Sequence, residues 1–403
     1  MATHYNVRTV TDGLVLALDA ANSKSFDSAE NLLTYSEQFD NAAWDKQFST
    51  VTANSVASPN GTTTADTFTA SSSAAFIYRA FSASAQTYTF SCFAKAGTAT
   101  SFRLDFVTAS YTLGCSCIFD LSAGTAGTVT LYGSSTGFIA SIQNFSNGWY
   151  RCSISGTSTA TTWYPQITLV NSSGTNIYIW GAQLETGSTA SSYYATIASI
   201  KTRGTTWTDL SGNGNNGTLV NGPTYNSSNG GSLVFNGSSQ YATTPAINLT
   251  TAGTVSAWFY KTGTGTPDGA NIVDIFSNVS SNGANGWSFA LNTSTNKIDF
   301  YIANNGGFGV EDFSTQTISN NTWYNVFVTY NGSNKIIYIN GVQDSTFASS
   351  VNGNATTNWS IGSRNTGARN FQGNIAQVSI YNRALSTAEV SQNYNALKSR
   401  YGI

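Results

Sequence analysis

Side chains that could carry out covalent chemistry are scarce in this sequence of 403 residues. A nucleophile activated by histidine would have to use His4, the one histidine, which lies close to the N-terminus. Glu311 and Asp312 form the most obvious carboxylate pair, but adjacent residues of an extended strand point to opposite faces and cannot share a cleft. Asp299 is a single acid within a strand-like segment. We therefore expect no enzymatic activity, and a glycan depolymerase is the least favoured function.

Sugar binding requires less, because an aromatic face and a few neutral hydrogen-bonding groups suffice. Aromatic residues make up 13% of the chain, and two large rings are adjacent in the segment Thr161–Pro165, where they cannot both face one core. Two further segments, Asn304–Gly309 and Arg364–Asn370, are long polar loops of the kind that carries binding sites. We predict sugar contacts from Trp163, Tyr164, Asn304, Asn305, Phe308, Arg364, Asn365 and Arg369.

The four cysteines fall within alternating, strand-like segments between residues 92 and 152. Cys92 shares a strand face with Tyr88 and Phe90, and the other three have similar apolar neighbours two residues away. The Cys115-x-Cys117 spacing without a nearby histidine is unsuited to zinc, and residues two apart on one strand are badly placed for a disulfide. We therefore expect buried, unpaired thiols.

Composition excludes several classes of partner. Charged residues make up only 9% of the chain, the net charge is -2, and the basic residues form no stripe that could bind nucleic acid. No apolar run reaches the roughly 20 residues needed to cross a bilayer, and no secretory signal precedes the first strand. We expect a protein that uses neither nucleic acid nor a membrane.

Most of the chain consists of short strand-like segments separated by Gly, Asn, Ser and Thr turns, which indicates an all-β fold built from antiparallel sandwiches. One helix is expected near the C-terminus, because Ser386 and Glu389 have the spacing of a capping box. Val390, Tyr394 and Leu397 would then lie on one face of that helix.

The C-terminal half resembles the concanavalin A-like, laminin G-like jelly-roll domains of phage structural proteins. Five segments in order carry this resemblance: Thr206–Leu219, Ser232–Gly237, Trp323–Ser333, Ile337–Gly341 and Tyr381–Ser386. In such domains a strand like Gly13–Asp19 leads, after a short loop, into the Trp-Thr-Asp-Leu-Ser-Gly segment at 207–212, from which it is here separated by almost 190 residues.

The intervening block resembles the carbohydrate-binding-module-like sandwich of phage tail and fibre proteins, on the segments Asn31–Trp44, Asn147–Cys152 and Ile179–Glu185. We therefore predict an N-terminal arm at 1–12, a discontinuous jelly roll at 13–27 plus 199–403, and an inserted sandwich at 28–198. A loop tip accepts such an insertion when the ends of the guest lie close together. The alternative is a tandem of two domains in which residues 1–27 form a free arm.

The resemblance implies a function and several partners. It implies a virion surface protein of a bacteriophage, in a tail fibre, spike or head decoration, that adheres to host-surface glycans and contacts other virion proteins. The alternative is a structural cement without sugar binding. It also implies a homo-oligomer, for which a trimer is usual, and a calcium ion at a loop edge, for which Asp268, Asp274 and Asp312 are the candidates.

Overall fold

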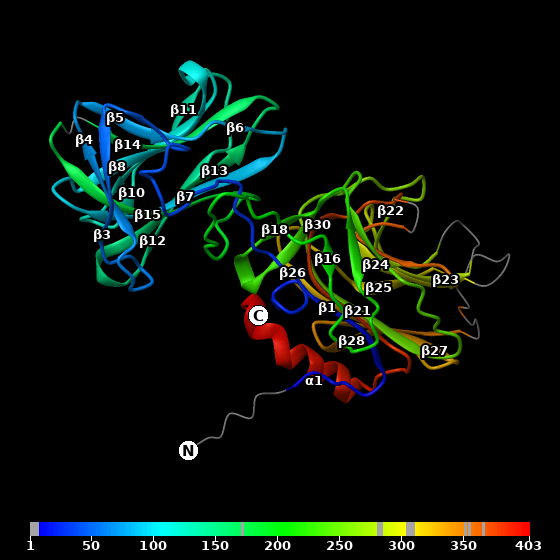
Figure 1. Ribbon diagram of the computed structural model, residues 1–403. Coiled ribbons are helices and arrows are strands. Elements are labelled where there is room, and N and C mark those ends of the chain that lie inside the picture. The colour runs from blue at the N-terminus through cyan, green and yellow to red at the C-terminus, as the bar shows by residue number, and fades with distance from the viewer. Residues whose placement is uncertain are drawn as a thin grey trace. The chain divides into compact units, whose positions relative to one another are not determined.

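The computed structural model divides the chain into two compact units, one made of residues 1–28 and 204–403 (unit 1) and the other of residues 29–203 (unit 2) (Figure 1). The structure describes residues 8–170, 173–279, 285–303, 311–349, 353, 356–364 and 367–403. Both units are built from antiparallel strands, and the one α-helix among the described residues is near the C-terminus, so the predicted all-β class is confirmed.

The first sheet of unit 1 is eight-stranded, with the order β18-β19-β30-β21-β26-β27-β28 and with β1 also paired to β30. Its strands are β1 (Leu14–Asp19), β18 (Thr224–Asn226), β19 (Ser232–Asn236), β21 (Gly253–Lys261), β26 (Trp323–Tyr330), β27 (Asn334–Ile339), β28 (Val342–Ala348) and β30 (Gln372–Tyr381), and the short 3-10 turn η3 (Ser228–Gly230) connects β18 to β19.

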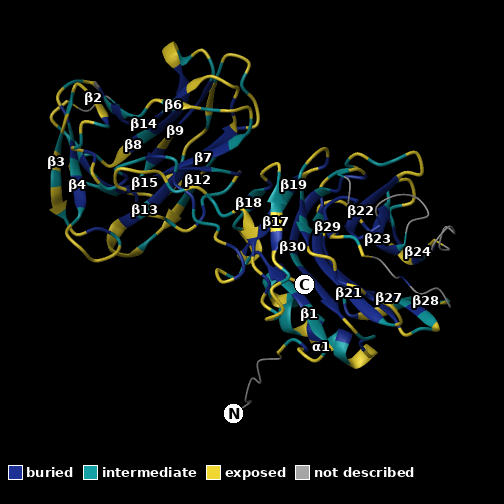
Figure 2. Cartoon of the chain, turned by 45° about the vertical axis from the view of Figure 1, so that its right-hand side comes forward, coloured by how far each residue is buried: buried dark blue, intermediate teal, exposed yellow. Residues whose placement is uncertain are grey.

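The second sheet of unit 1 is also eight-stranded, with the order β16-β17-β20-β29-β22-β23-β24-β25. Its strands are β16 (Thr206–Trp207), β17 (Gly217–Val220), β20 (Tyr241–Thr244), β22 (Ile272–Ser277), β23 (Gly286–Asn292), β24 (Lys297–Ala303), β25 (Asp312–Thr317) and β29 (Trp359–Ile361). Alternate residues such as Val255 and Ala257 from one sheet and Phe289 and Phe300 from the other are buried in one core, so the two sheets form a sandwich (Figure 2).

The helix α1 (Thr387–Leu397) and the turn η4 (Lys398–Tyr401) pack on the outer face of the first sheet. The predicted capping box is present, since the Ser386 side chain accepts from the Glu389 backbone N–H and the Glu389 carboxylate accepts from that of Ser386. Trp258 of β21 stacks on Tyr401 with ring centroids 4.1 Å apart. This stacking secures the end of the chain to the sheet.

Residues 8–12, the described part of the predicted N-terminal arm at 1–12, are joined to unit 1 by hydrogen bonds. The Val10 N–H donates to the Asn393 side chain at 2.7 Å, and the Val10 carbonyl accepts from the Tyr381 hydroxyl at 3.0 Å. Val10 is 9% exposed and packs against Val390 of α1. This segment is therefore part of unit 1, while residues 1–7 lie outside the described part of the chain.

Unit 2 is a second sandwich of two antiparallel sheets. One sheet has the order β12-β13-β7-β15-β4-β3, from the strands β3 (Ser49–Val56), β4 (Ala65–Ala70), β7 (Thr87–Ala96), β12 (Ile139–Asn144), β13 (Trp149–Thr157) and β15 (Asn176–Thr186). The other, called the platform sheet below, has the order β10-β9-β8-β14-β5-β2 with β11 and β6 attached, from the strands β2 (Asp45–Gln47), β5 (Ala74–Tyr78), β6 (Phe81–Ser82), β8 (Ser101–Thr108), β9 (Gly114–Asp120), β10 (Thr125–Ala126), β11 (Thr130–Tyr132) and β14 (Thr162–Val170). The turns η1 (Ala109–Tyr111) and η2 (Ser146–Gly148) precede β9 and β13.

All four cysteines are buried and unpaired, as predicted from the alternation. They pack among apolar side chains of the unit 2 core, in which Phe90, Phe119 and Ile154 are neighbours on the same strands. Burial raises the pKa of the Cys92 thiol. These thiols therefore act as small core residues.

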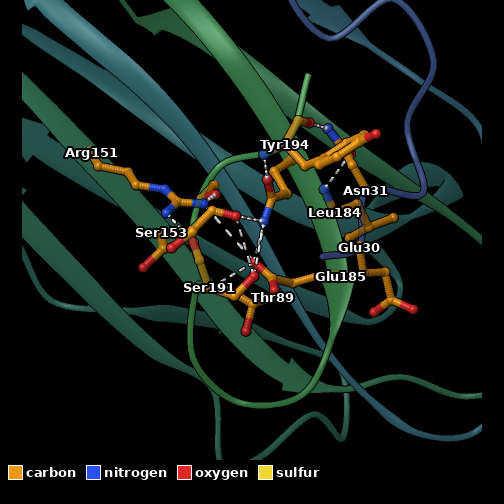
Figure 3. Close-up of polar contacts among 12 residues, drawn as sticks. Glu30, Asn31, Thr89, Arg151, Ser153, Leu184, Glu185, Ser191 and Tyr194 are labelled. Carbon is orange, nitrogen blue, oxygen red and sulfur yellow. Dashed lines mark hydrogen bonds and ion pairs between the residues drawn. The ribbon is translucent and has the colours of Figure 1, made fainter. Parts of the chain in front are cut away.

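Hydrogen bonds join the two segments by which the chain enters and leaves unit 2. Asn31 and Lys201 exchange two backbone hydrogen bonds, of 2.8 and 2.9 Å. The buried Asn31 amide also donates to the carbonyls of Ala182 and Tyr194 and accepts from the N–H groups of Leu33 and Leu184 (Figure 3). All four hydrogen-bonding positions of this amide are thus used, and three of them join the first residues of unit 2 to β15 and to the segment after it.

Buried charges complete the same junction. Arg203 forms ion pairs with Glu30 at 3.2 Å and with Glu185 at 3.8 Å, and Glu185 also accepts from the Ser191 N–H at 3.0 Å. Unit 1 closes in a similar way, because the Gly204 N–H donates to the Asp27 carbonyl at 2.9 Å. In each unit the two chain ends at the junction are therefore adjacent.

Candidate functional site

The outer face of the platform sheet carries a group of tyrosine and phenylalanine rings that the core does not use. We call Phe76, Tyr78, Tyr111 and Tyr164 the aromatic platform. The ring centroid of Tyr78 lies 5.8 Å from that of Phe76 and 5.6 Å from that of Tyr164. Phe76, Tyr78 and Tyr164 are half-buried, so each ring keeps an accessible surface.

Strand alternation places these rings outside the core. In β5, Ala75 and Ile77 are fully buried, so Phe76 and Tyr78 point to the other face. In β14, Trp163 and Ile167 belong to the core, and Tyr164 lies on the opposite face. The pairing of β5 with β14 then brings the rings of both strands together.

The register of the sheet sets polar groups in a row beside the rings. Tyr78 is opposite Asp45 of β2 on one side and Gln166 of β14 on the other, and Gln166 is opposite Asp105 of β8. Because directly opposite residues lie about 5 Å apart, the Gln166 amide borders the ring of Tyr78. The face thus carries ring surfaces beside the Gln166 amide and the carboxyl groups of Asp45 and Asp105.

These side chains line a cavity of about 330 Å³. This volume is near the lower end of the roughly 300–1,000 Å³ found for small-molecule sites. Every lining residue is uncharged: Gln47, Phe76, Tyr78, Thr108, Ala109, Ser110, Tyr111, Tyr164 and Gln166. Such a cavity can stack on an apolar ring face and form neutral hydrogen bonds, and neither a carboxyl group nor a histidine is among its lining residues.

Tyr111 is held in place by a buried ion pair. Arg103 and the fully buried Asp105 lie 2.7 Å apart, and Thr168 donates to the second Asp105 oxygen at 2.6 Å. Arg103 donates to the Tyr111 hydroxyl at 3.1 Å, and that hydroxyl donates to the Gln166 side-chain oxygen at 3.3 Å. Burial, together with the nearby Asp105 charge, raises the pKa of Tyr111 to about 12. The Tyr111 phenol is therefore a neutral hydrogen-bonding group at physiological pH.

The side chains of the predicted pair Trp163 and Tyr164 lie on opposite faces of the platform sheet. Tyr164 is part of the aromatic platform, whereas Trp163 is 1% exposed, packs on Phe106 at 4.8 Å and donates its indole N–H to the Thr159 carbonyl. A ring enclosed in this way has no face for a sugar, so the prediction for Trp163 is wrong. The predicted contacts Asn304, Asn305, Phe308 and Asn365 lie outside the described residues.

The two predicted arginines of unit 1 are engaged in ion pairs. Arg369 donates to Asp268 at 2.6 Å, and Arg364 lies 3.6 Å from Asp274 and donates to the Tyr301 hydroxyl at 3.2 Å. Both arginines are less than a tenth exposed. Arg364 thus contacts β22 and β24, and Arg369 contacts Asp268 before β22, an arrangement that offers little guanidinium surface to a sugar.

The predicted calcium ligands Asp268, Asp274 and Asp312 are not brought together as a metal cage. Asp268 and Asp274 are paired with the arginines described above, and Asp312 is paired with Lys335. Among the described residues, no group of three or more His, Cys, Asp or Glu side chains could hold a metal. Cationic side chains thus neutralise these aspartates, and the calcium prediction finds no support in their geometry.

Asp299 is fully buried on β24, and burial together with nearby acidic groups raises its pKa to about 8. Among the described residues neither carboxylate oxygen has a hydrogen-bond partner. Asp299 is therefore held as a neutral acid near pH 7.

Sequence reasoning missed Phe76, Tyr78, Tyr111 and Gln166. The segment Ala75-Phe76-Ile77-Tyr78 does contain the signal, since small and aliphatic side chains alternate with rings. Tyr111 has no such signal, because its place depends on an unusual turn and on partners in two other strands.

Comparison with known proteins bears on unit 1. A laminin G family model of the concanavalin A-like lectin/glucanases superfamily matches residues 236–391. No curated protein matches the chain. Unit 1 is thus similar to lectin-like domains of this superfamily, and its two-sheet architecture has the fold that the sequence resemblance implied.

Solved structures with partial similarity include binding domains of toxins and one domain of an arabinanase. The binding domain of Paraclostridial Mosquitocidal Protein 1 is 20% identical, with a TM-score of 0.39 over 47% of this chain and 49% of that one. Domain 4 of the arabinanase AbnA from Geobacillus stearothermophilus, solved with arabinotriose, is 16% identical with a TM-score of 0.37 over 46% of this chain and 92% of that one. The botulinum neurotoxin serotype G binding domain is 18% identical with a TM-score of 0.38 over 46% and 47%. The aligned part thus spans about half of the mosquitocidal and neurotoxin chains.

No helix within the described ranges is long and apolar enough to span a membrane.

Proposed function

We propose that this protein is a non-catalytic glycan-binding protein and that unit 2 binds sugar through the aromatic platform. The observation that carries the proposal is the cavity of about 330 Å³ lined entirely by rings, amides, hydroxyls and one alanine. Rings favour the apolar C–H face of a sugar, and the neutral groups suit its hydroxyls. The lectin-like similarity of unit 1 agrees with a binding role for the chain.

The setting we propose is the surface of a bacteriophage virion, on the sequence resemblance of both units to phage structural domains. Weak contacts between single sites and host glycans would be multiplied by many copies, because linked sites raise avidity without any new contact. A homo-oligomer and contacts with other virion proteins belong to the same proposal. The competing role is a cement that joins virion proteins and leaves the aromatic platform empty.

The test is binding of the full chain to a glycan array, followed by titration with the best neutral oligosaccharide. We expect Tyr78→Ala and Tyr164→Ala each to weaken binding by about 0.5–1.5 kcal/mol, the contribution of one aromatic pair, or roughly 2- to 12-fold in Kd. The double variant removes both central rings and should weaken binding by about 1–3 kcal/mol, or roughly 5- to 150-fold in Kd.

Tyr194→Ala is the matched control, because Tyr194 is an exposed tyrosine of the same unit that does not line the cavity. Its Kd should equal that of the wild type. Equal loss from Tyr194→Ala and from the aromatic platform variants would exclude the aromatic platform as the site. The cement role would be favoured if the wild-type protein bound no array glycan and no host cell but did bind to virions stripped of this protein.

A further inference from the structure

The cavity on the aromatic platform is closed on one side and open on the other. On the β8 side, Tyr111 reaches from the η1 turn across the face of the sheet to Gln166 of β14. Tyr132 packs behind it with ring centroids 5.0 Å apart and is itself joined to Ser116 at 3.0 Å. On the other side the lining ends at Gln47, an exposed residue of β2, which is the last strand of the sheet.

The closed side is firmly built. Ser110 and Tyr111 are consecutive non-glycine residues with φ of 56°, a left-handed conformation that is unfavourable for each of them. It is maintained by the hydroxyl contact between Thr108 and Thr112 at 2.8 Å and by the bond from the Leu113 N–H to the Thr108 hydroxyl at 2.9 Å. Strained backbone of this kind persists where surrounding contacts determine it, and it is concentrated at binding sites.

We propose that the aromatic platform binds the free end of a glycan chain, with the terminal sugar against Tyr111 and the rest of the chain leaving past Gln47 over the edge of the sheet. This inference rests on the proposed function. An internal segment of a polysaccharide continues in both directions and needs a groove that is open at both ends. Here the Tyr111 side chain and its partner Tyr132 occupy the path across β8 and β9.

The chemistry of surface glycans fits this arrangement. A glycan attached to a surface through its reducing end presents its non-reducing end outward. A site with one wall meets that end first, whereas a site for internal segments would have to lie along the chain. The terminal sugar would stack on Tyr78 and Tyr164 and be bordered by the Gln166 amide.

Binding stoichiometry distinguishes the two modes. Unbranched neutral oligosaccharide ladders of glucose, mannose, galactose, xylose and arabinose are screened against the full chain, and the ladder that binds is titrated by calorimetry from its shortest to its longest member. End binding predicts one protein per chain at every length, with an affinity that stops rising once the cavity is filled. Internal binding predicts a number of proteins per chain that grows with length.

The double variant Tyr111→Ala/Tyr132→Ala removes the wall and should convert the first result into the second, with several proteins on each long chain. Tyr111→Phe keeps the ring and should retain one protein per chain, and Tyr194→Ala should behave as the wild type. Protection of the buried cysteines from thiol reagent checks that each variant is folded.

The outcomes separate the two proposals. A wild-type stoichiometry that rises with chain length would overturn end binding while leaving glycan binding intact. Absence of binding to every ladder would overturn both. A Tyr111→Ala/Tyr132→Ala variant that is folded, binds the ladder and still takes one protein per long chain would show that these two rings are not the wall and would overturn the inference.

Discussion

Replacing the fully buried Asn31 with alanine should strongly destabilise unit 2. The side chain makes four hydrogen bonds, two as donor and two as acceptor, with distances of 2.9 to 3.2 Å. Each is expected to contribute about 1 kcal/mol, and alanine would leave the partner backbone groups buried without them. We therefore expect a loss of about 3–4 kcal/mol, or a hundred- to thousandfold larger population of the opened unit.

The cysteines provide an assay that reports on this unit alone. All four lie in unit 2 and all are buried, so a thiol reagent reacts only when unit 2 opens. Labelling rates measured across a urea series give the free energy of opening for the wild type and the variant. Intrinsic fluorescence would mix both units, because tryptophans occur in each.

Asn144→Ala is the matched control for Asn31→Ala. Asn144 is exposed on the edge strand β12, and its replacement should change the free energy of opening by less than about 0.5 kcal/mol. If Asn31→Ala changed it by no more than Asn144→Ala does, the account of unit 2 closure through this amide would be refuted.

Two further predictions concern charge. Hydrogen bonds from Arg383 and from the Ser386 backbone lower the pKa of Glu389 to about 2. The ionised Glu389 therefore stabilises unit 1 above its unfolded pKa of about 4.3, and this stabilisation is lost as the pH falls towards 2. The urea midpoint of unit 1 should fall over this range in the wild type and much less in Glu389→Gln. Because the lining of the aromatic platform is uncharged, the Kd for a neutral glycan should change less than twofold between about 0.01 and 1 M salt, and a steep dependence measured by calorimetry would contradict this binding mode.

Features that depend on local pattern could be predicted from the sequence. The alternation around Cys92 and the capping box at Ser386 involve residues a few positions apart, and both predictions are confirmed. Alternation also required Trp163 and Tyr164 to face opposite sides, but it could not decide which ring belongs to the core, since that depends on the sheet packed beneath β14.

Features that depend on distant partners could not be predicted. Asp268 was a reasonable metal ligand until Arg369, 101 residues later in the sequence, proved to be its partner. Tyr111 became part of a site only because the η1 turn carries its hydroxyl to Gln166, 55 residues away. In both cases the sequence contains the residues but not the contact.

The adjacent chain ends at the junction have a consequence for the history of such proteins. Unit 1 holds Asp27 next to Gly204 by a backbone hydrogen bond, so the segment between them leaves and re-enters unit 1 at neighbouring points. A recombination event that swapped residues 29–203 for another sandwich with neighbouring termini would leave the lectin-like host intact. The glycan preference that we propose for unit 2 could therefore change in a single genetic step, without a series of destabilised ancestors.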